Sequence, residues 1–396
     1  MKTRRQKLLA DNSLPIPTDL IYEIFSRLSP KYIARCRCVS KVWSSILDHQ
    51  DFTDQFLKKS STRPRLLFAY ETESKVFFFS SPQPQNPDED TPPTTASYHM
   101  SLDLNHVYRI HKPISGLVCI GDFSSLNGRE RPAMICVICN PSTGQSFTLP
   151  RIKTRKEHEM RSFFGYDPVE KQFKVLSMTL SDGNAISEEH HVLTLETGKL
   201  SWRLIECSEP HYPEYKSVCI DGVLYYRAAP NNTPSSMDEF MITCFDFRSE
   251  KFSFIKATAP GEVHRVPSLN LISYNGKLGS LKPNGSYSFS RENTSFEMWV
   301  LDDLEKKEWS KHSYKLPPQW QSVVPNNLKC VGVTGSNEIV FSEYIPSNPF
   351  YVFYYSLEKG TIRRVEIQGM EEFLTKHRVY TFLNHVEDVK LMKDVL

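Results

Sequence analysis

Apolar residues between positions 16 and 47 recur at helical spacing. Leu20, Ile24 and Leu28 lie at i, i+4 and i+8, which predicts one face of an amphipathic helix. Ser29-Pro30 ends this helix and begins a second one, because proline fits the first helical position. Some forty residues cannot bury all these apolar side chains internally. The pattern therefore predicts a compact helical module that docks onto a partner.

The helix starts carry capping signals. Thr18 is expected to cap the first helix after Pro17, with Asp19 adding negative charge to its first turn. Ser40 is expected to cap a third helix that carries Trp43. A fourth short helix is expected over 51–58. The segment 60–64, which ends in Pro64, then closes the helical module.

The order of residues in this module resembles the F-box, which docks onto the Skp-type adaptor of a cullin-RING ubiquitin ligase. The resemblance is carried by 16–20 (IPTDL), 23–24 (EI), 27–28 (RL) and 37–43 (RCVSKVW). It implies an F-box helical module over 14–60. The adaptor-binding residues that it implies are Ile16, Pro17, Leu20, Ile21, Ile24, Leu28, Ile33, Cys38, Val39 and Trp43.

From Arg65 onward, helical spacing gives way to alternating, aromatic-rich runs such as KVFFFS and FYVFYY, which are typical of strands. The part from 65 to 396 is therefore predicted to be all-β. Its largest interruption, 80–95 (SSPQPQNPDEDTPPTT), is rich in proline and acidic residues and is expected to be a disordered insertion.

Two interleaved series of turns divide this β part into repeats. One series starts at Asn140, Leu195, Asp246, Asp302 and Ser356, in steps of 55, 51, 56 and 54 residues. The other starts at Asp167, Asp221, Asn275 and Asn337, in steps of 54, 54 and 62 residues. Asp-Gly and Asn-Gly pairs between apolar runs are strong hairpin signals. Two hairpins in each repeat predict four antiparallel strands, the size of one propeller blade.

The predicted fold class is thus a small all-α module followed by an all-β propeller of about six four-stranded blades. Five blades come from the first turn series, and an early unit is expected from 66–70, 76–79 and 106–120. Seven blades and a stacked pair of β-sandwiches are the alternatives. Trp202, Phe254 and Trp309, which recur after the turns, are expected to pack between blades.

The β part resembles the F-box-associated domain (type 3-like) of plant F-box proteins. The carriers are 63–68 (RPRLLF), 140–144 (NPSTG), 164–168 (FGYDP) and 221–226 (DGVLYY). Their order, after an F-box, makes the combination specific. The resemblance implies that propeller loops hold a target protein.

Charge is distributed unevenly along the chain, although the net charge is only +2. Residues 1–60 hold 11 Lys and Arg against 6 Asp and Glu, and the remainder holds 37 against 40. A basic tail over 1–13 and a basic module suit an acidic protein partner. No stripe of basic residues with interleaved aromatics indicates a nucleic-acid interface. No run of 18 apolar residues indicates a membrane segment, so the chain is expected in the cytoplasm, the nucleus or both.

Reactive and metal-binding patterns are sparse. Cys136 and Cys139 have CxxC spacing, but alternation in a strand would point them to opposite faces, and no second pair completes a zinc site. The sequence contains no GxSxG, GxxxxGK[ST], HExxH or GxGxxG motif. We therefore expect no catalytic residue, no metal and no cofactor.

The function expected from the sequence is substrate recognition in an SCF-type (Skp-cullin-F-box) ubiquitin ligase. The module would bind the Skp-type adaptor, and through it the cullin and RING subunits, while the propeller binds a target protein whose identity the sequence does not give. A free-standing propeller scaffold without a ligase role is the alternative. An enzyme with a site built from distant loops is the second alternative.

Overall fold

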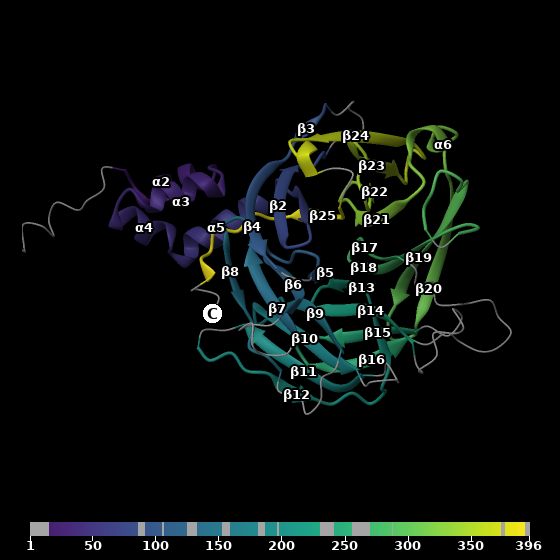
Figure 1. Ribbon diagram of the computed structural model, residues 1–396, viewed down its shortest axis with the longest axis horizontal. Coiled ribbons are helices and arrows are strands. Elements are labelled where there is room, and N and C mark those ends of the chain that lie inside the picture. Colours follow the sequence, from purple (N-terminus) through teal and green to yellow (C-terminus); the bar gives the residue numbers. More distant parts are fainter. Residues whose placement is uncertain are drawn as a thin grey trace, which may run out of the picture.

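The computed structural model consists of a helical module beside a larger ring of small sheets (Figure 1). The residues that it describes are 16–85, 92–104, 107–124, 133–152, 159–180, 187–195, 198–229, 241–255, 270–286, 288–373 and 377–392. The expected basic tail over 1–13 lies outside these residues.

Four helices form the module: α2 (Thr18–Phe25), α3 (Pro30–Arg37), α4 (Lys41–Leu47) and α5 (Gln50–Ser61). The predicted cap of α4 is confirmed, because the Ser40 hydroxyl accepts a hydrogen bond from the Trp43 N–H at 3.1 Å. The predicted cap of α2 is wrong. Thr18 is the first residue of that helix, and the residue before it is Pro17, with φ −54° and ψ 143° and no side-chain cap.

Six antiparallel sheets form the propeller, and each is named here as a blade with its strands in spatial order. Blade 1 contains β25 (Val379–His385), β1 (Arg65–Glu71), β2 (Lys75–Pro82) and β4 (Ser97–Asp103). Blade 2 contains β5 (Val107–Ile110), β6 (Val118–Ser124), β7 (Ala133–Asn140) and β8 (Gln145–Thr148). Blade 3 contains β9 (Glu159–Asp167), β10 (Gln172–Leu180), β11 (Ser187–Leu195) and β12 (Arg203–Ile205).

The remaining blades follow the same order. Blade 4 contains β13 (Tyr212–Ile220), β14 (Val223–Ala229), β15 (Met241–Asp246) and β16 (Lys251–Ile255). Blade 5 contains β17 (Asn270–Tyr274), β18 (Lys277–Pro283), β19 (Ser295–Asp303) and β20 (Glu308–Lys315). Blade 6 contains β21 (Leu328–Val333), β22 (Glu338–Glu343), β23 (Phe350–Ser356) and β24 (Ile362–Gln368), with β3 (Thr94–Thr95) added at its edge. Short helices α6 (Trp320–Val323) and η1 (Glu371–Phe373) lie between strands.

Both predicted turn series are confirmed. The first series joins the third and fourth strands of a blade, and the second joins the first and second strands. Asp221-Gly222 has φ values of 46° and 84°, and Asn275-Gly276 has 50° and 76°. Two successive positive φ values define the type I′ hairpin that these residue pairs favour. Six blades are therefore correct, and the seven-blade and β-sandwich alternatives are wrong.

The predicted composition of the early unit is partly wrong. Strands β1, β2 and β4 share their sheet with β25, which comes from the other end of the chain. The described part of the segment 106–120, which begins at Val107, contributes instead to β5 and β6, the inner hairpin of blade 2. A pairing between strands some 300 residues apart leaves no local signal in the sequence, and it closes the ring.

The expected insertion 80–95 is ordered at both ends. Ser80 and Ser81 are fully buried in β2, and the Ser80 hydroxyl accepts a hydrogen bond from Arg65 Nε at 2.7 Å. Thr94–Thr95 pairs in parallel with β24. Serine and proline predicted a loop, but cross-strand pairing extends the strand, because β propensity depends on context. Residues 86–91 lie outside the described part.

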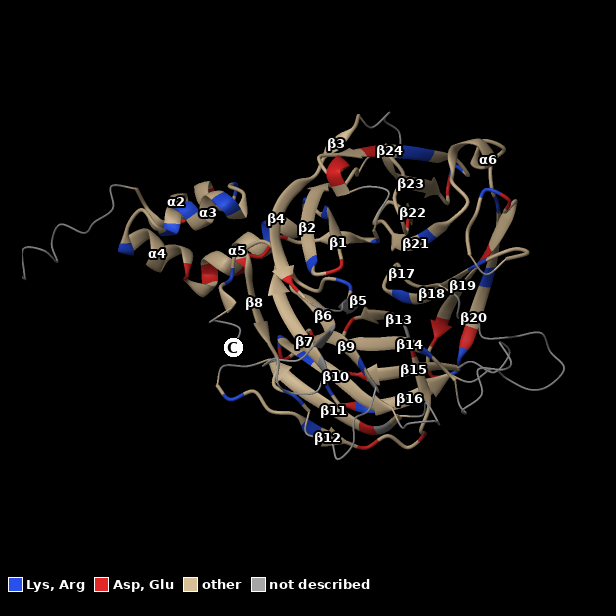
Figure 2. Ribbon diagram, in the orientation of Figure 1, with Lys and Arg blue, Asp and Glu red and all other residues tan. Residues whose placement is uncertain are grey.

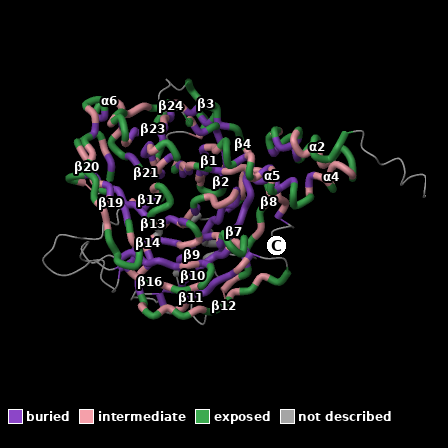
Figure 3. Tube along the Cα trace, turned by 180° about the vertical axis from the view of Figure 1, so that it is seen from behind, coloured by how far each residue is buried: buried purple, intermediate pink, exposed green. Residues whose placement is uncertain are grey.

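Hydrophobic cores lie between neighbouring blades all the way around the ring. Figure 3 shows that most strand residues are buried, whereas the module and outer turns are more exposed. The prediction for the recurring aromatics is confirmed: Trp202, Phe254 and Trp309 each pack against one of these cores. Trp202 also donates its indole N–H to the Pro150 carbonyl at 2.6 Å.

Gly165 provides a test of this packing. A Cβ atom there would lie 1.8 Å from the ring of Phe247, which is fully buried and belongs to the core between blades 3 and 4. We expect Gly165→Ala to lower the free energy of unfolding by about 3 kcal/mol, because overpacked cores strain their neighbours. Gly335→Ala, where nothing lies within 4 Å, is the control for denaturant unfolding. Equal stability of the two variants would contradict the predicted clash.

Candidate functional site

The ten residues predicted to bind the adaptor divide into two groups by burial. Six are exposed, and we name them the docking surface: Ile16, Pro17, Leu20, Ile24, Cys38 and Val39. Leu20 and Ile24 are 54% and 52% exposed and lie one turn apart on α2. Val39, which follows α3, is 64% exposed. Several exposed apolar side chains on one small helical module are typical of an interaction site.

The other four residues contribute to the module's own core. Ile21 and Ile33 are buried, while Leu28 and Trp43 are partly buried against the same cluster. The Trp43 ring meets Phe25 edge-on at 5.0 Å between centroids. These residues hold the helices together, so Ile21 and Ile33 support a docking surface without being accessible to a partner. Helical spacing alone cannot separate the two roles, because the exposed Leu20 and Ile24 and the buried Ile21 all lie on α2.

Polar contacts fix α2 against α5. Glu23 accepts hydrogen bonds from Arg27 at 2.7 Å and from Lys59 on α5. Those two bonds lower the pKa of Glu23. Burial raises the pKa of Cys36, so this thiol stays protonated and behaves as a small apolar group. Arg63, just after α5, donates to the Ser26 carbonyl at 2.8 Å.

Arg37 connects the module to the carboxyl-terminal part of the chain. Its Nη2 donates to the carbonyls of Leu47 at 3.0 Å and Val389 at 2.8 Å, and its Nε lies 2.8 Å from an Asp48 carboxylate oxygen. Val389 is itself buried in the module core. The segment 387–392, which we name the C-terminal clamp, therefore completes a core that the helices begin.

The other side of the C-terminal clamp is held by α5 and blade 2. Its Glu387 N–H donates to the Ser60 hydroxyl at 2.8 Å. Asn140 in β7 donates to the carbonyls of Asp388 and Lys390 at 3.1 and 3.3 Å. In Figure 1 this yellow segment runs beside α5 and β8. The clamp thus joins the helical module to the propeller. The sequence showed Asn140 only as a turn residue and gave no signal for this contact.

The buried Asp388 carboxyl is expected to make stability depend on pH. Burial raises its pKa from 3.8 to about 6, so the folded protein binds a proton more readily than the unfolded chain between these values. The ionised group therefore opposes folding above about pH 6, by at most about 3 kcal/mol, and this penalty disappears as the pH falls towards 4. We expect Asp388→Asn to be more stable than wild type at pH 7.5 and to lose that advantage at pH 4. A constant difference across urea titrations from pH 4 to 7.5 would contradict this.

One cluster of possible metal ligands occurs among the described residues, namely His190, Cys207 and His211. His211 Nδ1 lies 2.8 Å from the Glu209 carbonyl, and its Nε2 lies 2.6 Å from the Tyr226 hydroxyl. Because a carbonyl only accepts, Nδ1 carries the proton and Nε2 accepts from tyrosine. Neither nitrogen keeps a free lone pair for a metal. Cys136 and Cys139 point into different cores, as predicted, which does not suit a shared zinc ion.

Two ring side chains in the connections between blades are core residues. Trp320 is fully buried and donates to the Ser290 carbonyl at 2.8 Å, and His211 is also fully buried. Tyr344 remains partly accessible beside Lys329 and Arg378.

Family comparisons match nearly the whole chain. Residues 14–55 match the F-box domain, and residues 65–386 match the F-box associated beta propeller domain. The F-box protein DOR of Arabidopsis thaliana is 53% identical over 99% of this chain and 100% of its own length. Two further F-box proteins of Arabidopsis thaliana are 45% and 43% identical, covering 97% and 99% of this chain and 92% and 99% of their own lengths.

Solved structures resemble the chain only weakly. The β-propeller domain of the Trilobed protease from Pyrococcus furiosus aligns with a TM-score of 0.37 at 12% identity, over 67% of this chain and 71% of that one. The α-L-arabinofuranosidase Arb93A from Fusarium graminearum gives 0.41 at 10% identity, over 70% and 92%. No functional argument rests on either. Within the described part of the chain, no helix has the length and apolar character needed to span a membrane.

Proposed function

This chain belongs to the F-box proteins that carry an F-box associated beta propeller domain, and on that premise we propose that it recognises substrates for an SCF-type ubiquitin ligase. The observation that carries the proposal is the docking surface, a set of exposed apolar side chains on a module that the C-terminal clamp joins to the propeller. Through this surface the module would bind a Skp-type adaptor, and through the adaptor the cullin and RING subunits.

The proposed mechanism is positional, and the chain itself is non-catalytic. The propeller holds a target protein while the other ligase subunits transfer ubiquitin to a lysine of that target. A tether raises the effective concentration of the two reacting partners, which accelerates the second encounter without new chemistry. The contacts of the clamp support this mechanism, because a firmly joined propeller presents its target at a restricted distance from the adaptor.

The test is reconstitution from purified components. The full-length chain is expected to co-purify with a Skp-type adaptor and to form a stoichiometric complex with cullin and RING subunits on size-exclusion chromatography. The alternative, a free-standing scaffold, predicts a monodisperse propeller that leaves the adaptor unbound. Failure of the purified folded chain to bind any Skp-type adaptor would overturn the proposal.

A further inference from the structure

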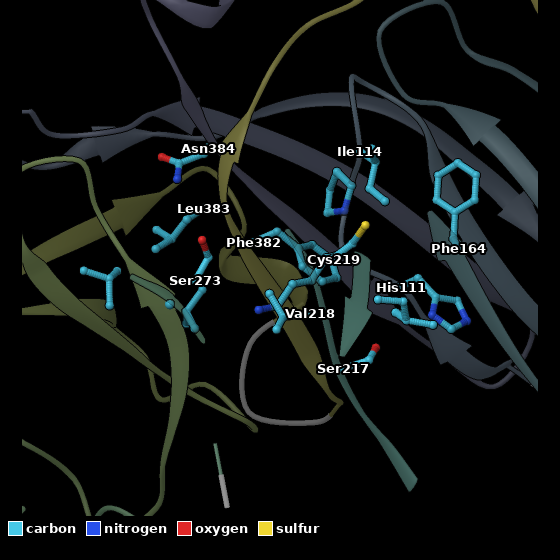
Figure 4. A pocket seen from close by; sticks show the side chains of 16 residues that line it. His111, Ile114, Phe164, Ser217, Val218, Cys219, Ser273, Phe382, Leu383 and Asn384 are labelled. Carbon is cyan, nitrogen blue, oxygen red and sulfur yellow. The ribbon is translucent and has the colours of Figure 1, made fainter. Parts of the chain in front are cut away.

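The centre of the propeller contains two neighbouring cavities. The larger, of about 180 Å³, is lined from all six inner strands or their ends, among them His111, Phe164, Ser217, Ser273, Val331 and Asn384 (Figure 4). The smaller, of about 70 Å³, shares His111, Lys112 and Ser217 with it. Because they share lining residues, the two cavities are adjacent, and we name the pair the channel.

Cationic side chains from four blades meet at one end of this channel. We name Arg109, Lys112, Lys216, Lys329 and Arg378 the cationic mouth. Arg109 lies in β5, Lys216 in β13 and Lys329 in β21, while Lys112 follows β5 and Arg378 precedes β25. Arg109, Lys112 and Lys329 line the smaller cavity directly. In Figure 2, blue segments lie beside β5 and β21 near the middle of the ring.

The members of the cationic mouth act on one another. Burial, followed by repulsion from the four other cations, lowers the pKa of Lys329 to about 8. Burial and Arg109 also lower the pKa of Lys112. Yet Lys112, Lys216 and Lys329 all remain accessible to solvent. They therefore reach into water inside a protein-walled opening, where screening is weaker than on an open surface.

Among the residues that the structure describes, the carboxylates near the cationic mouth are fewer than its cations. Among the described residues, Glu71 acts on Arg378, Glu214 acts on Lys216, and Glu343 lines the smaller cavity. A Glu214 carboxylate oxygen also lies 3.4 Å from Arg227 Nε, so this carboxylate neutralises Lys216 less than it would alone. A concentration of like charge weakens folding and is typically retained at functional sites. An incoming anion would relieve the repulsion.

The size of the channel limits what that anion can be. Drug-sized ligands occupy cavities of roughly 300–1,000 Å³, whereas these cavities hold about 180 and 70 Å³. Such a space accepts the end of one side chain and not a cofactor or a polyphosphorylated ring. The size therefore favours an anionic group carried on a protein segment that lies across the opening.

The position of the cationic mouth also suits a target. Arg378 immediately precedes β25, whereas His385, the last residue of β25, pairs with Arg65 next to the helical module. Seven residues of strand separate these ends by roughly 23 Å. The cationic mouth thus opens away from the point where the module is attached, so a bound segment and an adaptor would not compete for space.

We propose that the cationic mouth binds an anionic side chain, a carboxylate or a phosphate, on an acidic segment of the target protein. The inference rests on the proposed function, because it identifies the chemistry by which the propeller recognises its target. Arg109 and Arg378 would provide forked hydrogen bonds to the anion, while Lys112 and Lys329 provide charge at its sides.

The test titrates the full-length protein into three fluorescein-labelled peptides and follows fluorescence anisotropy. The peptides are hexaglutamate, a Gly-Ser peptide with one phosphoserine, and the same Gly-Ser peptide without phosphate. We expect at least one anionic peptide to bind and the neutral peptide not to bind. The preferred anionic peptide identifies carboxylate or phosphate as the recognised group. Affinity should fall at least about fivefold when salt rises from about 0.1 to about 0.5 M.

Charge-matched variants locate the binding. The double variant Lys112→Gln/Lys329→Gln is expected to bind the anionic peptide at least about tenfold more weakly than the wild-type protein does. Lys171→Gln/Lys306→Gln, which removes the same charge at exposed turns between strands, is expected to bind as wild type does. The thermal midpoint of Lys112→Gln/Lys329→Gln should equal or exceed that of the wild-type protein, because the two substitutions remove repulsion between the cations of the mouth. Equal binding by the two variants would overturn the inference.

The remaining outcomes separate this inference from the proposed function. If neither anionic peptide binds the wild-type protein, the inference is overturned. A thermal-shift assay with pyrophosphate accompanies this test. If pyrophosphate raises the thermal midpoint but neither peptide binds, the site binds small anions only, and the inference is likewise overturned. Adaptor co-purification is scored on the same preparations. Peptide binding without adaptor binding contradicts the proposed ligase role alone, and adaptor binding without peptide binding contradicts this inference alone.

Discussion

The double variant Leu20→Asp/Ile24→Asp is expected to stay folded and to lose adaptor binding. Both side chains are more than half exposed and lie one turn apart on α2, so aspartate at these positions leaves the module core intact. In a complex, each carboxylate would be buried against apolar surface without a partner. We expect the affinity for the adaptor, measured by isothermal titration calorimetry, to fall at least about a hundredfold, which is equivalent to about 3 kcal/mol.

A matched control uses exposed apolar residues of the propeller. Val169 and Leu204 are 57% and 68% exposed, so Val169→Asp/Leu204→Asp makes the same chemical change away from the module. This control should bind the adaptor as wild type does. Leu28 is a poorer choice for the test, because it packs partly in the module core and its replacement would also unfold helices. Retained binding in the α2 variant would show that the adaptor contacts another surface.

Val389→Asp is expected to release the helical module from the propeller. Val389 is 1% exposed, packs in the module core and accepts the Arg37 hydrogen bond through its carbonyl. A carboxylate there would lose water without gaining a compensating partner, at a cost of about 4 kcal/mol. We expect the module to unfold at a lower temperature, while the propeller transition stays unchanged. Limited proteolysis within residues 61–64 should then be at least about tenfold faster.

Val169→Asp provides the control for the introduced charge, because it changes an exposed valine. Its module transition and proteolysis rate should match those of wild type. A single unshifted transition in Val389→Asp would mean that the C-terminal clamp contributes nothing to the module. A loss of both transitions would mean that module and propeller unfold as one unit.

Features of the fold that depend on residues close together in the sequence were predictable, and those that depend on contacts between distant residues were not. Turn pairs such as Asp221-Gly222 fix local backbone geometry through their positive φ values, so they marked hairpins, and the regular steps between turns marked five of the six blades. The membership of blade 1 was not predictable, because β25 pairs with β1 from the opposite end of the chain. Ser80 and Ser81 were expected in a loop for a related reason: their strand is imposed by pairing with β1.

The candidate site shows the same division. The resemblance to the F-box named Leu20, Ile21, Ile24 and Ile33 together as adaptor-binding residues. Only the packing of α5 and Val389 separates the exposed pair, Leu20 and Ile24, from the buried pair, Ile21 and Ile33. Lys112 and Lys329 are more than two hundred residues apart in the chain, and nothing near either one indicates the other.

The sequence by itself therefore determined the F-box motif, the repeat of hairpins and the four-stranded blade, because each depends on residues within about 60 positions. The tertiary structure decided which apolar residues form the docking surface, how the C-terminal clamp joins the two parts, and where the cationic mouth lies. These features depend on burial and on charges brought together from distant strands. Burial and electrostatic repulsion arise only when the chain closes into a ring.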